Sequence, residues 1–104
     1  MIADQARDIL NNLESIRITR GELARLLDVT PTQLRDLLEM HGTNFKALRH
    51  EARVNRADEL FGKVSQRELA NAIGIGGDLW FKTFSQWRDR HGLDRLSIRH
   101  REAA

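Results

Sequence analysis

Two short polar stretches carry side chains that could hydrogen-bond to the edges of DNA base pairs. In the first, Arg35 could donate two bonds to guanine, Gln33 could pair with adenine and Asp36 could accept from cytosine. In the second, Lys82 and Gln86 are the best candidates. The alternative is that these are solvated surface residues, with Asp36 paired to Arg35 or Lys46. The full set of candidate base-reading residues is Thr32, Gln33, Arg35, Asp36, Lys82, Ser85 and Gln86.

A second group of candidates is basic and lies toward the C-terminus. The net charge of the 104 residues is only +2, but residues 79–101 hold six basic and two acidic residues. Cations of this kind contact phosphates, which raises the affinity and its salt dependence without distinguishing one base from another. The candidate phosphate contacts are Arg88, Arg90, Arg95, Arg99 and Arg101.

The residue types argue against catalysis. Cysteine is absent and the four histidines have no metal-ligand spacing. Paired carboxylates and a nucleophile-base set are also missing, so we expect no enzyme activity, no metal and no cofactor. No apolar run approaches the ~20 residues of a membrane span, and the acidic N-terminus is unlike a signal peptide. We therefore expect a cytoplasmic protein without a membrane partner, and binding to DNA would make it nucleoid-associated.

The elements that would carry these side chains are helices. Proline occurs once and runs of β-branched residues are missing, which predicts an all-α fold. A first helix is expected at about residues 3–16. Two capping boxes, Thr19 with Glu22 and Thr30 with Gln33, predict the starts of two more helices.

Buried and turn positions can be assigned within this first unit. Leu23, Leu26 and Leu27 are expected to form the buried side of the second helix. The turn that follows should lie at Asp28, because aspartate tolerates the left-handed backbone conformation. Gly42 is the expected residue just beyond the end of the third helix.

The second half of the chain repeats this order. Residues 22–24, Glu-Leu-Ala, recur as residues 68–70, and each copy is followed by His-Gly, at residues 41–42 and 91–92. Ser65 and Glu68 form a third potential capping box. From the alanine to the glycine, the second copy is longer by about one helical turn, placed either in its glycine-rich loop or in its second helix.

Residues 43–61 are predicted to form a single helix joining the two copies. Nineteen residues would span about 28 Å, comparable with the ~34 Å between successive major-groove faces. A short helix, a tight turn and a second capped helix form a helix-turn-helix, which presents its second helix to the major groove. The predicted organisation is residues 1–42, a first helix-turn-helix unit with a leading helix; residues 43–61, a linker helix; and residues 62–104, a second unit with a basic tail.

Residues 23–61 resemble the AraC/XylS-type DNA-binding domain of bacterial transcription regulators. The matching positions are Gly42, Phe45, Leu48, Arg53, Val54, Ala57, Leu60 and Phe61, and residues 65–74 resemble the start of that family's second module. The sequence departs from the family at Asp28, at Ile75 and at Asp36, where the family often has a cation. The resemblance covers roughly residues 19–92. It implies a bilobed helical protein that binds two adjacent major-groove segments of double-stranded DNA, and Met1 with the family length leads us to expect a whole chain.

A different function is kept open by the aromatic residues. Trp80, Phe81, Phe84 and Trp87 are spaced as the core of the second unit, yet Trp80 and Phe81 together are more apolar surface than one helix face can bury. One of those two is therefore expected to be exposed. The alternative function is a small co-activator or anti-activator that uses Trp80 and Phe81 to bind another regulator or RNA polymerase.

Overall fold

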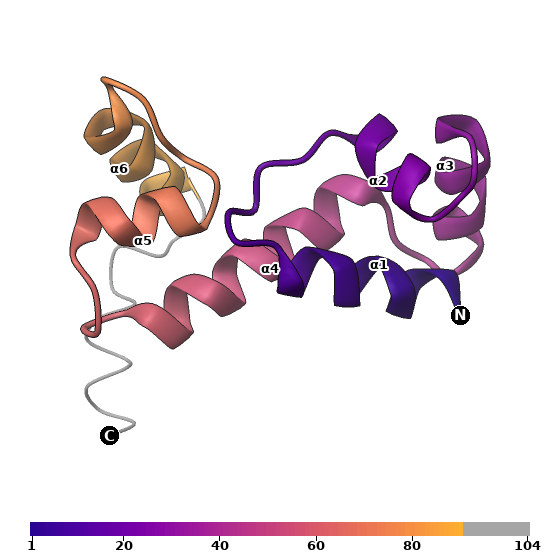
Figure 1. Cartoon of the computed structure of the whole chain (residues 1–104), viewed down its shortest axis with the longest axis horizontal. Helices are drawn as coiled ribbons and strands as arrows, with labels where there is room; N and C mark the ends of the chain where they lie inside the picture. Colours follow the sequence, from indigo (N-terminus) through magenta and orange to yellow (C-terminus); the bar gives the residue numbers. More distant parts are fainter. Residues whose placement is uncertain (91–104) are drawn as a thin grey trace.

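The computed structural model describes residues 1–90, and this part of the chain is all-α with no β-strand (Figure 1). This confirms the predicted fold class. Within those residues, no helix is both long and apolar enough to cross a membrane. The helices are α1 (Ile2–Asn12), α2 (Arg20–Leu26), α3 (Pro31–Met40), α4 (Phe45–Leu60), α5 (Gln66–Ala72) and α6 (Trp80–Arg90).

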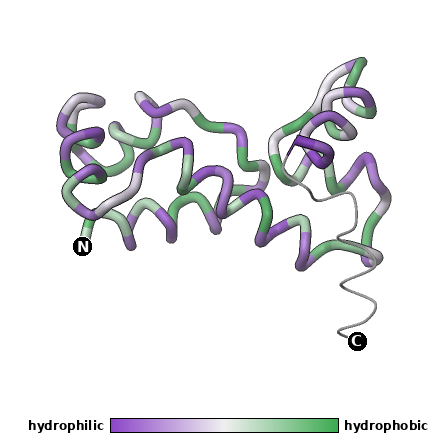
Figure 2. The backbone as a smooth tube through the Cα atoms, turned by 180° about the vertical axis from the view of Figure 1, so that it is seen from behind, coloured by the Kyte–Doolittle hydropathy of each residue, from purple (hydrophilic) through white to green (hydrophobic). Residues whose placement is uncertain are grey.

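The helices surround two separate hydrophobic clusters, and α4 contributes to both. Leu48 and Ala52, in the first half of α4, belong to a cluster with α1, α2 and α3. Ala57, in its second half, belongs to a cluster with α5 and α6. Apolar and polar residues alternate along the backbone in Figure 2, as expected for helices that bury one face. The 16 residues of α4 make it about 24 Å long, shorter than the predicted 19 residues.

Side-chain caps begin α2 and α3 at the predicted residues. In α2 the Thr19 hydroxyl accepts from Glu22 N while Thr19 N donates to the Glu22 carboxylate, each at 3.1 Å. In α3 the Thr30 hydroxyl accepts from Gln33 N and Thr30 N donates to Gln33 Oε1. Both capping boxes are therefore confirmed. At α5 the hydroxyl of Ser65 accepts from the backbone N–H of Glu68, which is the first half of the box.

The turns after α2 and α5 have the same hydrogen bonds 46 residues apart. Val29 N donates to Ala24 O at 3.0 Å, and Ile75 N donates to Ala70 O at 2.8 Å. The left-handed residue of the first turn is Asp28, with φ of 60°, as predicted. Gly74 occupies the equivalent place in the second turn, with φ of 95°. The sequence repeat is thus a repeat of backbone geometry.

Two local expectations are corrected by the structure, and one open alternative is decided. The first helix ends at Asn12 rather than Ile16, because Leu13 is extended and the chain then turns toward α5. Leu26 is 61% exposed, since it lies at the open gap between α1 and α2 while Leu23 faces the core. The extra length of the second copy lies in its loop: residues 73–79 separate α5 from α6, whereas residues 27–30 separate α2 from α3.

Replacing Thr30 by alanine is expected to lower the free energy of unfolding by about 1 kcal/mol, because it removes the hydroxyl that accepts from Gln33 N. Urea denaturation followed by circular dichroism measures this loss. Thr32→Ala is the matched control, because Thr32 is exposed two positions further along α3. Equal losses in the two variants would show that the cap does not stabilise α3.

Candidate functional site

The four candidates on α3 lie together on its exposed side. Leu34 and Leu38 are fully buried and fix the rotation of the helix about its axis. This leaves Thr32, Arg35 and Asp36 exposed to solvent, with Gln33 beside them. The exposed side of α3 therefore presents the polar and charged groups that the sequence predicts.

Three of these four side chains, those of Gln33, Arg35 and Asp36, have partners within the protein. Gln33 Oε1 accepts from the backbone of Thr30, so its amide is committed to the cap and has only its NH₂ group to offer outward. The Arg35 guanidinium donates to Asp36 at 3.3 Å, in one of the two arrangements expected from solvated residues. Since both side chains are more than half exposed, this pair contributes little stability and can exchange for another partner.

Arg35 also lies at the edge of a cationic hollow that the sequence did not predict. The hollow has a volume of 340 Å³. It is lined by Arg20 at the start of α2, Arg35 on α3 and Lys46 at the start of α4, with Asn44 and Phe45. Three cations from three helices would attract an anion such as phosphate. Arg20 directly follows the N-cap Thr19, and Lys46 is the second residue after the N-cap Asn44, but only packing of the three helices brings them together.

On α6 the candidates face outward from a buried aromatic pair. Phe84 and Trp87 are buried and stack with 6.2 Å between their ring centroids. Lys82 and Gln86 are exposed on the remaining surface, and Ser85 is half-exposed. The orientation of these three candidates is therefore the one that the helical pattern predicts.

The predicted phosphate contacts differ in accessibility. Arg90 is exposed, whereas Arg88 is half-buried, with its guanidinium 5.0 Å from the centroid of the Phe84 ring. The Nε atom of Arg88 is buried without a hydrogen-bond partner among residues 1–90. Arg88 thus covers the second cluster in addition to any outward contact. Arg95, Arg99 and Arg101 lie outside the described residues.

The start of α6 exposes large apolar side chains. Phe81 is 59% exposed and Leu79 is 63% exposed, while Trp80 is partly buried against the second cluster. The rings of Trp80 and Phe81 meet edge to face, 6.2 Å apart. The prediction that one of the two aromatic residues is exposed is confirmed, and that residue is Phe81.

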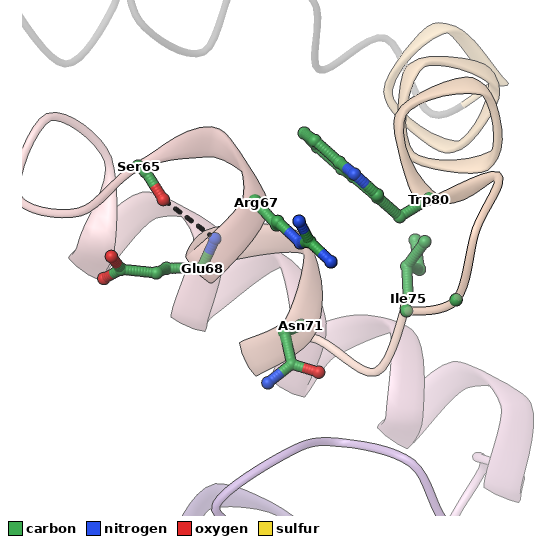
Figure 3. Close-up of a pocket in the computed structure, with 8 residues that line it drawn as sticks. Ser65, Arg67, Glu68, Asn71, Ile75 and Trp80 are labelled. Carbon is green, nitrogen blue, oxygen red and sulfur yellow. Dashed lines mark hydrogen bonds between the residues drawn. The ribbon is translucent and has the colours of Figure 1, made fainter.

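Each repeat has a hollow between its two helices, at equivalent positions. The first hollow, of 530 Å³, is lined by Gly21, Arg25, Asp28, Val29, Thr30, Pro31 and Gln33. The second hollow, of 450 Å³, is lined by Ser65, Arg67, Glu68, Asn71, Ile75, Gly76, Gly77 and Trp80. Figure 3 shows Arg67 and Trp80 extending into it from α5 and α6. One arginine lines each hollow: Arg25 near the end of α2 lines the first, and Arg67 in the first turn of α5 lines the second.

Inside the molecule, two arginines of α4, Arg53 and Arg56, donate to backbone carbonyls. Arg53 Nη2 donates to the carbonyl oxygen of Ile16 at 3.2 Å, while Glu51 accepts from Arg7. Burial, with Arg49 nearby, lowers the pKa of Arg53 to about 10. Arg53 is therefore still a cation at neutral pH.

Among residues 1–90, no three histidine or acidic side chains are grouped so that they could hold a metal ion. No protein-family model, curated protein or solved structure matches this chain.

Proposed function

We propose that this protein is a bacterial transcription regulator that binds double-stranded DNA sequence-specifically, without catalysis or a cofactor. In this proposal α2 with α3 and α5 with α6 are two helix-turn-helix units, and α4 is the linker helix between them. Helices α3 and α6 would enter two adjacent segments of the major groove. The AraC/XylS-type resemblance of α4 and its flanks supports the proposal, which places the protein at the nucleoid in the cytoplasm.

The observation that carries the proposal is the repeated geometry of the two helix pairs. Each pair has an internal turn with the same backbone bonds, and the second helix of each leaves polar side chains exposed. In Figure 1 both pairs lie on the same side of α4. Two second helices on one side of a connecting helix of about 24 Å could reach successive grooves on one face of a duplex.

The distribution of cations supports a polyanionic partner. The hollow lined by Arg20, Arg35 and Lys46 adjoins the exposed side of α3, so a phosphate there would lie beside the groove that α3 enters. On α6, Arg90 is exposed at the C-terminal end. Contacts of this kind fix the position of a protein on DNA, while the base-edge contacts distinguish sequences.

Fluorescence anisotropy with mixed genomic DNA at several salt concentrations tests the proposal. We expect binding that weakens steeply as salt rises, and enrichment of a defined site when bound sequences are selected from a random pool. Absence of binding at low salt would refute a DNA-binding function. Binding without an enriched sequence would leave only non-specific affinity.

Arg35→Ala is expected to reduce discrimination at one base pair of the selected site by about 1 to 3 kcal/mol, because a bidentate contact to guanine would be lost. Lys46→Ala is the matched comparison, since Lys46 lines the same hollow from α4. It should weaken binding about equally on every sequence and lower the salt slope by about one. Anisotropy titrations on the selected site and its single-base variants measure both effects. An equal loss on all sequences for Arg35→Ala would reassign Arg35 to phosphate.

The exposure of Leu79 and Phe81 favours a second candidate function, binding to another regulator or to RNA polymerase. Two large apolar side chains, each about 60% exposed within three residues, resemble the centre of a protein interface more than a DNA-facing surface. Phe81→Ser that abolished activity in a reporter assay without changing DNA affinity would support this function. Loss of DNA affinity in Phe81→Ser would assign the residue to the DNA interface instead.

A further inference from the structure

The two hydrophobic clusters are joined by a second connection besides α4. The loop between α1 and α2 reaches the end of α5, as Figure 1 shows. There Ile16 N donates to Ala72 O at 3.0 Å, and the Ser15 hydroxyl donates to Asn71 O at 2.6 Å. Ile16 is fully buried in the first cluster, so a residue of one cluster is bonded directly to the helix that covers the other.

Arg56, in the second half of α4, donates hydrogen bonds both to the α1 side and to the α5 side of this connection. Its Nη2 donates to Asn11 O at 2.9 Å, near the end of α1. Its Nη1 donates to Glu14 O at 3.2 Å and to Ala72 O at 3.0 Å, the last residue of α5. One guanidinium therefore bonds three carbonyls from two sides of the gap between the clusters.

The chemistry of helix ends explains why arginine suits this place. The last four carbonyls of a helix have no partner within it, and the C-terminal end of its dipole attracts a cation. Here the ends of α1 and α5 approach one another, and the planar fork of Arg56 can supply donors to both at once. Arg53 adds a bond to Ile16 O from the preceding turn of α4.

The backbones at this contact are too close to accommodate a side chain. A Cβ atom added to Gly74 would lie 2.1 Å from the carbonyl oxygen of Ile16. The approach of the α1–α2 loop to the turn after α5 is thus a fitted contact. The α1–α2 loop, the end of α5 with the turn after it, and two arginines of α4 thus form one contact, which we name the carbonyl strut. Its residues are Ser15, Ile16, Arg53, Arg56, Ala72 and Gly74.

We propose that the carbonyl strut fixes the rotation and distance of α6 relative to α3, and that the protein consequently selects DNA whose two half-sites have one fixed spacing. A single helix between two small clusters can bend or twist, whereas two connections form a closed frame that resists both. One inserted base pair turns the second half-site by about 34° around the duplex axis. A rigid protein cannot follow that rotation without losing contacts. The spacing part of this inference rests on the proposed DNA-binding function.

Distances between two spin labels test the strut without DNA. The sequence lacks cysteine, so Glu39→Cys on α3 and Asp89→Cys on α6 provide two exposed labelling sites. Pulsed dipolar spectroscopy should give one narrow distance distribution, broadened at least about twofold by Arg56→Met, which keeps the aliphatic length but removes the donors. Ser15→Ala should broaden it less, because only one bond is lost and folding is retained. Arg67→Met, an exposed arginine of α5 outside the strut, should leave it unchanged.

The effect on DNA is tested by anisotropy titrations of the selected site and of versions whose half-sites are one or two base pairs closer or further apart. The unaltered protein should bind the best spacing about 10-fold or more tightly than the others, as for a mismatched base pair. Arg56→Met should reduce this ratio to about threefold or less, mainly by weakening binding to the best site. Ratios that Arg56→Met leaves unchanged would overturn the role of the strut in spacing.

The outcomes separate the strut from the proposed function. A broad distribution in the unaltered protein, or a narrow one that neither Arg56→Met nor Ser15→Ala changes, would overturn the strut. A narrow distribution that Arg56→Met broadens, with no DNA binding, would refute the proposed function and the spacing inference while the strut stands. A narrow distribution with equal affinity at every spacing would overturn the spacing inference alone.

Discussion

Replacing Phe84 by alanine is expected to unfold α5 and α6 while α1, α2 and α3 remain folded. Phe84 is 3% exposed, stacks on Trp87 and lies beneath the guanidinium of Arg88. Loss of a buried phenylalanine costs about 3 to 5 kcal/mol, and among residues 1–90 the second cluster has only seven buried residues, Phe84 being one of them. The first cluster is separate, with 11 buried residues in the described part of the chain, and does not contain Phe84. Local unfolding of the second cluster is therefore favoured over unfolding of the whole chain.

The two tryptophans make this prediction measurable, because Trp80 and Trp87 both lie in the second cluster. Tryptophan fluorescence follows that cluster alone, whereas circular dichroism follows all helices. In Phe84→Ala the fluorescence transition should occur at lower urea concentration than the main circular-dichroism transition. Phe81→Ala is the matched control, since Phe81 lies on the same helix but is exposed, and its transitions should stay close to those of the unaltered protein. Coincident transitions in Phe84→Ala would show that the clusters unfold as one unit.

Gly74→Ala is expected to lower the free energy of unfolding by about 3 to 4 kcal/mol. An L-residue in the left-handed region costs roughly 1 to 2 kcal/mol, and Gly74 has φ of 95°. The added Cβ would also collide with Ile16 O. Relief of that collision must displace Ile16. Its carbonyl oxygen accepts from Arg53 and its N–H donates to Ala72 O, and each of these bonds is worth about 1 kcal/mol.

Gly77→Ala separates these two causes. Gly77 has φ of 92°, almost the same as Gly74, but a Cβ there would meet no atom within 4 Å. It should therefore show the backbone strain alone, about 1 to 2 kcal/mol. Urea denaturation by circular dichroism gives both values, and the difference of about 2 kcal/mol measures the contact with Ile16. Equal losses would mean that the α1–α2 loop yields to the new methyl group at negligible cost.

Both variants, Phe84→Ala and Gly74→Ala, are also expected to change DNA binding if the proposed function is correct. If the second cluster unfolds locally in Phe84→Ala, the variant should keep α3 and its cationic hollow but lose the contacts of α6. Affinity for DNA should then fall toward that of a single helix-turn-helix unit. In Gly74→Ala both units stay folded at low temperature, so a change in spacing preference would come from the carbonyl strut.

Local features of this protein could be predicted from sequence because they depend on neighbours within four residues. The helix starts at Thr19 and Thr30 follow from a hydroxyl and a carboxylate or amide three positions apart. The left-handed turn at Asp28 and the outward orientation of Arg35 and Lys82 follow from residue type and helical period. These features establish the all-α fold and the repeat without knowledge of the packing.

Tertiary structure alone decided which of these groups meet. Arg20, Arg35 and Lys46 line one hollow because three helices converge there, and nothing in their spacing indicates it. Arg53 donates to a carbonyl of the α1–α2 loop and Arg56 to the last carbonyl of α5, and nothing in the sequence of α4 indicates either partner. Long side chains have such a reach that their partners are determined by which backbone groups remain unsatisfied nearby.

Positions 28 and 74 show this division most clearly. Residue type is enough to predict both as turn residues after equivalent helices, because aspartate and glycine tolerate a positive φ. The requirement for glycine at position 74 comes from packing, since the carbonyl oxygen of Ile16 occupies the place that a side chain would take. Backbone conformation is a local property and can be inferred from residue type. Close approach between segments 58 residues apart depends on the packing of the whole chain.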